Sequence, residues 1–271
     1  MSEASHVQPA DPRAWINSLP RVVGPQAAVL VRLLDAVEAD PRIRALRLRG
    51  SVARGTADAY SDLDTRIWVS DDEYEACLAD LPTLVRSIGP ILDILFETPG
   101  SPYLFAQFAD GVQLELSSGR ASEAIGRDHG VVVLLDRDGL WDQPYEPAPA
   151  WDEHLWLGWA WIALSDVDKH LRRESLWEAL TTLEKARSLL VRRHAAETGM
   201  RDPEYGVTSI LDYGGTLPEG LESTVARLDA ADIRRAAYAC AELLAAYGRR
   251  PFTEFVLARL ARPRVRRPGV R

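Results

Sequence analysis

Residues 48–55 read LRGSVARG and residues 60–64 read YSDLD, and the predicted fold depends mainly on these two stretches. In the first, an apolar segment ends in Gly-Ser; in the second, another apolar segment begins with Asp-x-Asp. Alternate residues of a strand point to the same face, so Asp62 and Asp64 are expected to project together. Two adjacent carboxylates repel each other unless a positive group lies between them, and Mg²⁺ carrying phosphates is the usual group. The two stretches therefore predict a strand–loop–strand unit with a metal site beside the loop.

The loop between these two strands has a composition suited to binding phosphate. Gly50 allows the main chain to approach a ligand closely. Backbone N–H groups and the Ser51 hydroxyl can then hold phosphate oxygens, with Ser61 as a neighbouring donor. Arg54 lies in the same loop, where phosphate contact and simple exposure to solvent explain it equally well.

A third carboxylate completes such a site, and Glu115 is the best candidate. It lies in the middle of the predicted strand at residues 112–116, between two leucines. An unpaired acid buried there would be costly, and strand alternation places Glu115 on the face opposite the leucines. We expect that face to be the one that carries Asp62 and Asp64. Two Mg²⁺ ions held by these acids would activate an attacking hydroxyl and stabilise a leaving pyrophosphate.

Hydrophobic periodicity extends this unit on both sides. Helical spacing covers residues 26–38, and a second helix is expected from Ser70 to about residue 88. Asp110-Gly111 predicts a hairpin turn between two strands. The expected strands are residues 43–49, 62–69, 91–96, 103–108, 112–116 and 131–135.

The character of the sequence changes after the proline-rich residues 144–149, which form the best candidate linker. Helical patterns then cover residues 151–198, with a break near Arg173, and continue at 221–228 and 230–247. The expected fold is an α/β (α+β) domain with a mixed sheet, followed by a C-terminal helical bundle domain. The predicted segments are a loose N-terminal leader at 1–20, the α/β domain at 21–145, the helical domain at 151–258 and a basic tail at 259–271.

Composition sets the outer limits on function. The chain has 271 residues, enough for about two domains of roughly 150 residues each. Its formal net charge is -8, because 40 Asp and Glu outnumber 32 Lys and Arg. This balance disfavours a nucleic-acid binder and suits a cationic partner or a site that recruits metal ions. Two cysteines, no signal-like leader and no bilayer-length apolar run predict a cytoplasmic protein without a membrane partner.

The quoted motifs resemble the signature of the nucleotidyltransferase superfamily with the polymerase-β-like fold. Gly50-Ser51, a spacer and Asp62-x-Asp64 match its strand–loop–strand unit, and the predicted hairpin before Glu115 resembles the one that carries its third acid. Residues 135–139 are similar to a segment of small-molecule adenylyltransferases. The helical half resembles the aminoglycoside (streptomycin-type) and lincosamide nucleotidyltransferases in architecture. The motif match covers roughly residues 43–140.

The resemblance implies an enzyme that transfers a nucleoside monophosphate, with AMP from ATP favoured, to a hydroxyl of a small molecule. An aminoglycoside-like antibiotic is the favoured acceptor, which implies a role in antibiotic resistance. Asp62 and Asp64 would ligate Mg²⁺, and Glu115, which is Asp in many members, would act as ligand, general base or both. Gly50 and Ser51 would hold the triphosphate. Two interpretations stay open beside this one: adenylylation of a protein partner of the toxin–antitoxin type, and a degenerate module that only binds nucleotide.

The helical half contains weaker candidates for the same site. Lys185 and Arg201 would contact the nucleotide phosphates, although a surface salt bridge is the commoner role for such residues. Tryptophans gather at the start of this half, where they would stack on a base or sugar ring or, more commonly, fill the core. They are Trp151, Trp156, Trp159, Trp161 and Trp177.

Overall fold

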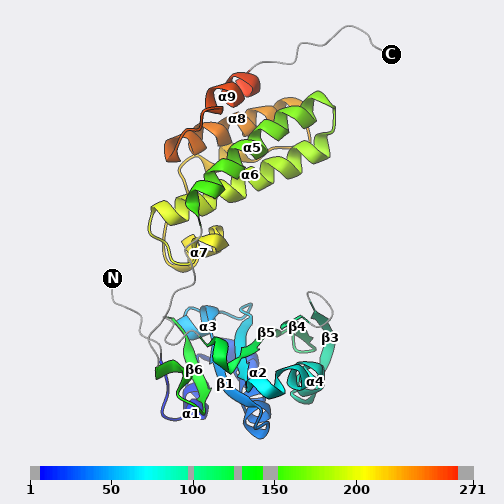
Figure 1. Cartoon of the computed structure of the whole chain (residues 1–271), viewed down its shortest axis with the longest axis vertical. Coiled ribbons are helices and arrows are strands. Elements are labelled where there is room, and N and C mark those ends of the chain that lie inside the picture. Colours follow the sequence, from blue (N-terminus) through cyan, green and yellow to red (C-terminus); the bar gives the residue numbers. More distant parts are fainter. Residues whose placement is uncertain (1–6, 97–100, 125–129, 143–151, 262–271) are drawn as a thin grey trace. The chain divides into compact units, whose positions relative to one another are not determined.

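The computed structural model describes residues 7–96, 101–124, 130–142 and 152–261. The chain divides into two compact units, Met1–Ala148 and Pro149–Arg271, which are described separately below (Figure 1). The predicted linker at residues 144–149 lies outside the described residues.

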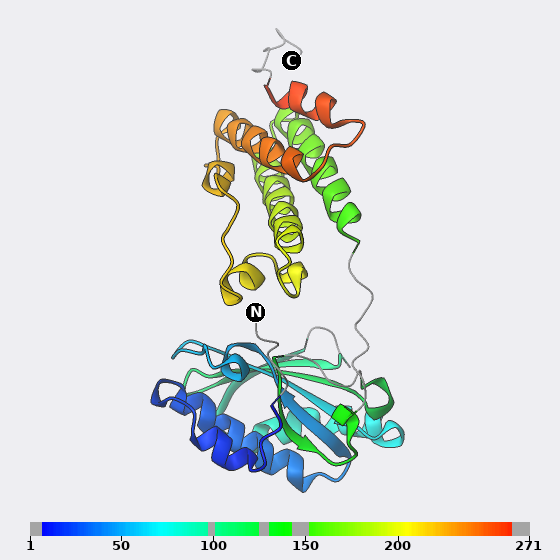
Figure 2. The ribbon, with the colours of Figure 1, turned by 90° about the vertical axis from the view of Figure 1, so that its left-hand side faces the viewer.

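The first unit is built on a six-stranded sheet with the strand order β3-β4-β5-β2-β1-β6 (Figure 2). Strands β2 and β5 are parallel, and every other neighbouring pair is antiparallel. The sheet is therefore mixed, which confirms the predicted fold class. The strands are β1 (Ile43–Leu48), β2 (Leu63–Val69), β3 (Ile91–Phe96), β4 (Tyr103–Phe108), β5 (Gln113–Arg120) and β6 (Val132–Asp136).

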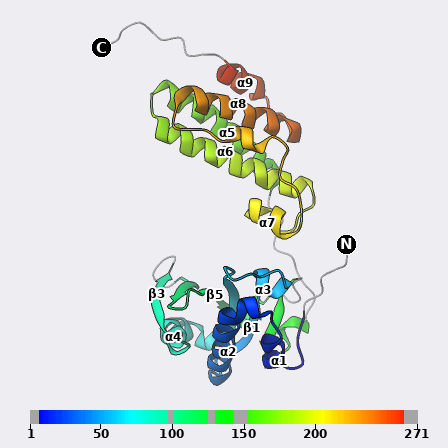
Figure 3. The ribbon, with the colours of Figure 1, turned by 180° about the vertical axis from the view of Figure 1, so that it is seen from behind.

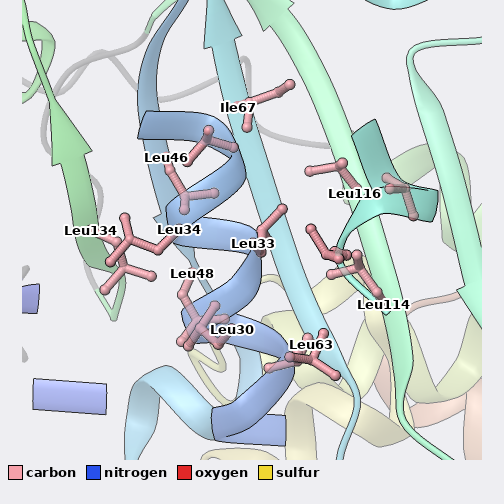
Figure 4. Packing of buried hydrophobic residues seen from close by; sticks show 14 of the residues in the cluster. Leu30, Leu33, Leu34, Leu46, Leu48, Leu63, Ile67, Leu114, Leu116 and Leu134 are labelled. Atoms are coloured by element: carbon pink, nitrogen blue, oxygen red, sulfur yellow. The ribbon is translucent and has the colours of Figure 1, made fainter. Parts of the chain in front are cut away.

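Helices α2 (Gly24–Ala39) and α4 (Tyr74–Ser87) cover one face of this sheet (Figure 3). The buried stripe on α2 follows the helical period, and its leucines meet those of the central strands. Leu63 and Ile67 of β2 point into this core, so the alternate residue Asp64 faces the opposite, open side of the sheet. Figure 4 shows the packing of Leu30, Leu33, Leu34, Leu46, Leu48, Leu63, Ile67, Leu114, Leu116 and Leu134.

The N-terminal segment is more ordered than its sequence indicates. Helix α1 (Pro12–Asn17) lies inside the predicted leader, and its Ile16 is fully buried in the sheet–helix core. The side chain of Asp11 caps this helix by accepting a hydrogen bond from the Ala14 N–H. Val7 also forms a bridge with Val132. A helix of six residues carries too little periodicity to be recognised without its tertiary contacts.

The second unit consists mainly of helices (Figure 1). The predicted break near Arg173 is confirmed, and Glu174 there adopts a left-handed conformation with φ of 61°. In contrast, the helix expected at residues 221–228 is reduced to the 3-10 turn Leu221–Thr224. The helices are α5 (Glu153–Arg172), α6 (Leu176–Glu197), α7 (Val207–Asp212), α8 (Ala230–Tyr247) and α9 (Thr253–Ala261).

A buried ion cluster joins three helices of this unit. Asp168 of α5 is 1% exposed and receives the guanidinium groups of Arg172, Arg234 and Arg259, at nitrogen–oxygen distances of 2.7, 3.1 and 2.6 Å. Arg259, predicted to belong to a basic tail, therefore lies in α9 and contributes to the fold of the unit. None of the described helices is long and apolar enough to cross a membrane.

Candidate functional site

The turn after β1 brings the main chain against the first acids. Arg49 precedes the short helix α3 (Gly50–Arg54), and its backbone N–H donates to the Asp64 carbonyl at 2.8 Å. Gly50 has φ of +70°, a conformation that side chains with a Cβ rarely adopt. A Cβ placed on Gly50 would lie 1.8 Å from Oδ2 of Asp64. Only glycine lets the turn pass this close to the carboxylate.

Helix α2 holds the loop between α3 and β2 through hydrogen bonds. Gln26 is buried, and its Nε2 donates to the carbonyls of Ser61 at 2.9 Å and Ala59 at 3.3 Å. The Ser61 hydroxyl accepts from the Asp58 N–H at 3.0 Å and donates to Asp58 Oδ1 at 3.2 Å. These bonds fix the entry of β2, so Ser61 has a structural role, and its contact with nucleotide stays a prediction.

Two of the three predicted acids lie side by side on neighbouring parallel strands. Asp64 of β2 is in register with Glu115 of β5. The hydroxyl of Thr65 donates to the Glu115 carbonyl at 2.8 Å and ties the two strands together at this point. Asp62 is exposed and lies one residue before β2 rather than within it. The strands that carry these acids are neighbours, as the predicted site requires.

Burial and mutual repulsion disfavour the charged forms of Asp64 and Glu115, and the nearby arginines offset this only in part. Burial raises the pKa of Asp64 to about 6, and the negative charges of Asp62 and Glu115 add to this effect. The pKa of Glu115 is also raised, by burial and by Asp62. Arg49 lowers both pKa values, and Arg54 lowers that of Asp64, yet the net shifts remain upward. A cation placed between the acids would relieve this excess of negative charge.

Mg²⁺ suits the chemistry of these donors, because it prefers carboxylate oxygens and completes its shell with phosphates and water. Within the described ranges, however, no group of three His, Cys, Asp or Glu side chains is arranged tightly enough to hold a metal ion. Carboxylates that repel one another are expected to stay apart until a cation joins them. The assignment of Asp62, Asp64 and Glu115 as metal ligands stays a prediction.

A cavity of about 320 Å³ opens on the open face of the sheet beside these acids. Asp62 and Glu115 line one end of it. From there it extends over β4 to β3, where Asp93, Leu95 and Phe105 contribute to its wall.

Sequence reasoning missed two residues of this region. Arg49 precedes the Gly-Ser pair and is no part of the motif, yet its charge acts on both Asp64 and Glu115. Asp93 lies on a strand without a motif, and only the pairing of β3 with β4 and of β4 with β5 brings it to the same face. The alternation of charged and apolar residues in β1 was a usable signal for Arg49.

Of the two phosphate-contact candidates in the second unit, Lys185 lies on the surface and Arg201 is partly buried. Lys185 is exposed, with Nζ 5.9 Å from the ring centre of Trp159. Nε of Arg201 lies 4.0 Å from a carboxylate oxygen of Asp202. The roles of Lys185 and Arg201 toward nucleotide stay predictions.

The tryptophans of the second unit divide into two groups. Trp156 and Trp161 are buried in the helical core. Trp159 and Trp177 are exposed, at 52% and 71%. Trp151 lies outside the described residues. Core packing therefore accounts for only part of the cluster.

The chain is similar to several solved structures at low identity. It aligns with an aminoglycoside 6-adenyltransferase from Bacillus subtilis at 16% identity, covering 86% of this chain and 98% of that chain, with a TM-score of 0.35. Terminal uridylyl transferase 4 from Trypanosoma brucei with bound UTP and UMP aligns at 14% identity, covering 73% of this chain and 62% of that chain, with a TM-score of 0.30. The CD-NTase CdnG of Bradyrhizobium diazoefficiens in complex with GTP aligns at 16% identity, covering 88% and 72%, with a TM-score of 0.30.

No protein-family model matches the sequence, and no curated protein matches it. The solved structures bear the names of nucleotidyltransferases, the class that the sequence motifs resemble. At these TM-scores, a functional assignment rests on the residues of the site itself.

Proposed function

We propose that the chain is a Mg²⁺-dependent nucleotidyltransferase that moves a nucleoside monophosphate, AMP from ATP in the favoured case, to a hydroxyl of a small molecule. One observation carries this proposal: a glycine turn lies directly against Asp64, whose pKa is raised by burial and by two neighbouring acids. A site of this kind combines a main chain open to phosphate with uncompensated carboxylates that favour a divalent cation. When bound, Mg²⁺ would neutralise charge on the triphosphate and lower the pKa of the attacking hydroxyl.

The residues divide the remaining tasks. Asp62, Asp64 and Glu115 would hold the metal, with two ions expected. Gly50 and Ser51 would cradle the triphosphate through main-chain N–H groups and a hydroxyl. Arg54, whose charge already acts on Asp64, would pair with a phosphate oxygen, with Ser61, Lys185 and Arg201 as further candidates.

The transfer step follows from these positions. The acceptor oxygen forms a bond to the α-phosphorus while the bond from that phosphorus to the bridging oxygen breaks, and pyrophosphate leaves. Glu115 would take the hydroxyl proton if one of its carboxylate oxygens lies within hydrogen-bond reach of the acceptor hydroxyl, in addition to or in place of its role as a metal ligand. The product is a phosphodiester between the acceptor and the nucleoside.

An aminoglycoside-like antibiotic is the favoured acceptor, with antibiotic resistance as the consequence. The acids along the cavity wall and the net charge of -8 both favour a cationic molecule over a nucleic acid.

We place the protein in the cytoplasm. The two cysteines, Cys77 and Cys240, are buried and free, which suits this reducing compartment.

A transfer assay with α-³²P-labelled nucleotides tests this proposal. The four ribonucleotides are each combined with streptomycin, kanamycin, lincomycin and a set of candidate proteins, with and without Mg²⁺. Label on a small molecule, dependent on Mg²⁺ and lost in both Asp62→Asn and Asp64→Asn, is the expected result. Label on a protein alone would replace the acceptor class, and near-normal transfer by either variant would overturn the metal site.

A further inference from the structure

The open face of the sheet carries two rows of side chains, one across four strands and the other across three. One row consists of Leu95, Phe105, Glu115 and Asp64, which are paired in register from β3 to β2. The next row consists of Asp93, Gln107 and Gln113, also paired in register. Residues directly opposite each other on paired strands share a face, so both rows line one surface. The cavity of about 320 Å³ lies along these rows.

Asp93 marks the end of this cavity that lies away from the metal ligands. It is exposed, and its only side-chain bond among the described residues is an acceptor bond from the neighbouring Ile94 N–H at 2.9 Å. No ion pair of Asp93 occurs in the described ranges, and no basic side chain lines the cavity. A cation that enters the cavity would find this carboxylate uncompensated.

The strand spacing places Asp93 outside the predicted metal site. Asp93 lies on β3 and Glu115 on β5, two strand spacings apart, which corresponds to about 10 Å. Two ligands of one Mg²⁺ lie within about 4 Å of each other, since each is about 2 Å from the ion. Asp93 is therefore not expected to ligate the same ion as Glu115.

The wall between the two ends is apolar. Leu95 is 62% exposed and Phe105 is 43% exposed, and both line the cavity between Asp93 and Glu115. A large exposed aromatic face offers stacking contact to the C–H face of a saturated ring. Gln113 donates to Gln107 at 3.0 Å, so amide groups border the same surface and can contact hydroxyls.

We propose that this cavity is the acceptor site and that Asp93 binds an ammonium group of the acceptor while its hydroxyl reaches Glu115. The inference rests on the proposed function for the identity of the reacting hydroxyl. The acceptor is a polyhydroxylated ring compound with at least one amine, and its amine and reacting hydroxyl are separated by one or two linked rings. Phe105 and Leu95 contact the ring face between these groups.

Calorimetric titration of the full chain with kanamycin tests the site, with Mg²⁺ and a non-transferable ATP analogue present. Kanamycin in which every amine is acetylated serves as the matched uncharged ligand. In Asp93→Asn the Kd for kanamycin is expected to rise about tenfold or more, because a hydrogen bond to a charged group is lost. The Kd for the acetylated compound is expected to stay unchanged.

Two further variants separate the site from general effects. Asp93→Glu keeps the charge and is expected to restore most of the affinity for kanamycin. Asp72→Asn removes the same charge from an exposed position just after the other end of β2 and is expected to leave the Kd unchanged. An equal loss in Asp72→Asn would show a long-range charge effect and overturn the assignment of Asp93.

Transfer measured on the same proteins distinguishes the two proposals. Kanamycin that binds in an Asp93-dependent way but receives no nucleotide supports the cavity and contradicts the transfer. Wild-type transfer to kanamycin with an unchanged Kd in Asp93→Asn supports the transfer and overturns the cavity. Failure of kanamycin to bind the wild-type chain overturns the cavity as an amine site.

Discussion

Gly50 and Asp64 are in direct contact: a Cβ at position 50 would lie 1.8 Å from Oδ2 of the Asp64 carboxylate. No side chain that carries a Cβ fits this gap unless the carboxylate moves. The glycine therefore does more than permit φ of +70°, because it also fixes where Asp64 can lie. The turn and the metal-ligand candidate form one structural unit, and a change in either is expected to disturb the other.

Gly50→Ala is predicted to abolish nucleotide transfer, with a loss of at least about 100-fold, since displacement of a catalytic group is costly. Gly55→Ala is the matched control, because Gly55 has φ of +73° and no atom within 4 Å of a Cβ placed there. Both variants are expected to lose about 1 kcal/mol of stability from the left-handed conformation. Only Gly50→Ala should lose transfer and the rise in Tm on addition of Mg²⁺. Equal activities of the two variants would contradict the role of the Gly50–Asp64 contact.

Asp64→Asn is predicted to be more stable than the wild-type chain at pH 7.5 in the absence of metal. The pKa of Asp64 is about 6 in the folded state against an ordinary 3.8, so the folded state binds more protons between about pH 4 and pH 6. The free energy of unfolding therefore falls as pH rises through this window, and the loss is complete above pH 6. A shift of this size corresponds to at most about 3 kcal/mol, which partial exposure reduces to about 1–2 kcal/mol.

Urea denaturation at pH 4 and pH 7.5 measures this effect. The two proteins are expected to be equally stable at pH 4 and to differ at pH 7.5, where Mg²⁺ should stabilise the wild-type chain and leave Asp64→Asn unchanged. Asp72→Asn, an exposed acid outside the site, serves as the control with no expected gain. If Asp64→Asn were less stable than the wild-type chain at pH 7.5, the ionised Asp64 carboxylate would be stabilised by the protein without a cation.

Arg49→Gln is predicted to lower the metal-free stability at pH 7.5 by about 1 kcal/mol, because its charge lowers the pKa of both Asp64 and Glu115. Addition of Mg²⁺ should recover the loss, since the cation replaces the missing positive charge. Thermal melts of the two proteins with and without Mg²⁺ measure this difference. Arg49→Lys keeps the charge and should behave as wild type, whereas a loss of the same size at pH 4 would indicate packing rather than charge.

The sequence predicts the site best where the alternation of apolar and acidic residues lies within a single strand. Leu63, Ile67 and the acid Asp64 alternate along β2, so the buried face and the acidic face follow from periodicity alone. Glu115 was identifiable for the same reason, as a charged residue between buried leucines. Residues that meet only through the pairing of strands carry no such signal, and Asp93 is the clearest case.

Local stability is the second limit on what sequence can predict. Helix α1 is six residues long and depends on the burial of Ile16, which no local pattern reveals. Residues 221–228 show the opposite case: their sequence has a helical pattern, but the structure forms only a 3-10 turn there. In both segments, tertiary packing outweighs the weak intrinsic preference of the chain.

Asp168→Ala is predicted to destabilise the helical unit by about 3–5 kcal/mol, because it leaves the guanidinium groups of α5, α8 and α9 without their shared partner. Although burial raises the pKa of Asp168, the bonds from Arg172, Arg234 and Arg259 more than offset it, so the net pKa is lowered. The stability that Asp168 supplies is therefore present above its unfolded pKa and is lost as pH falls through the folded value.

Urea denaturation followed by hydrogen exchange of the backbone amides of α5, α8 and α9 reports on this unit. The wild-type chain and Asp168→Ala should differ most at pH 7 and converge as the pH falls through the lowered pKa of Asp168, where the carboxylate becomes protonated. Arg172→Ala is the matched control: its side chain is 54% exposed, so loss of this one pair should cost less than about 1 kcal/mol. If Asp168→Ala and Arg172→Ala lowered the free energy of unfolding by the same small amount, Asp168 would contribute no more than an exposed ion pair does. It would then not link the three helices.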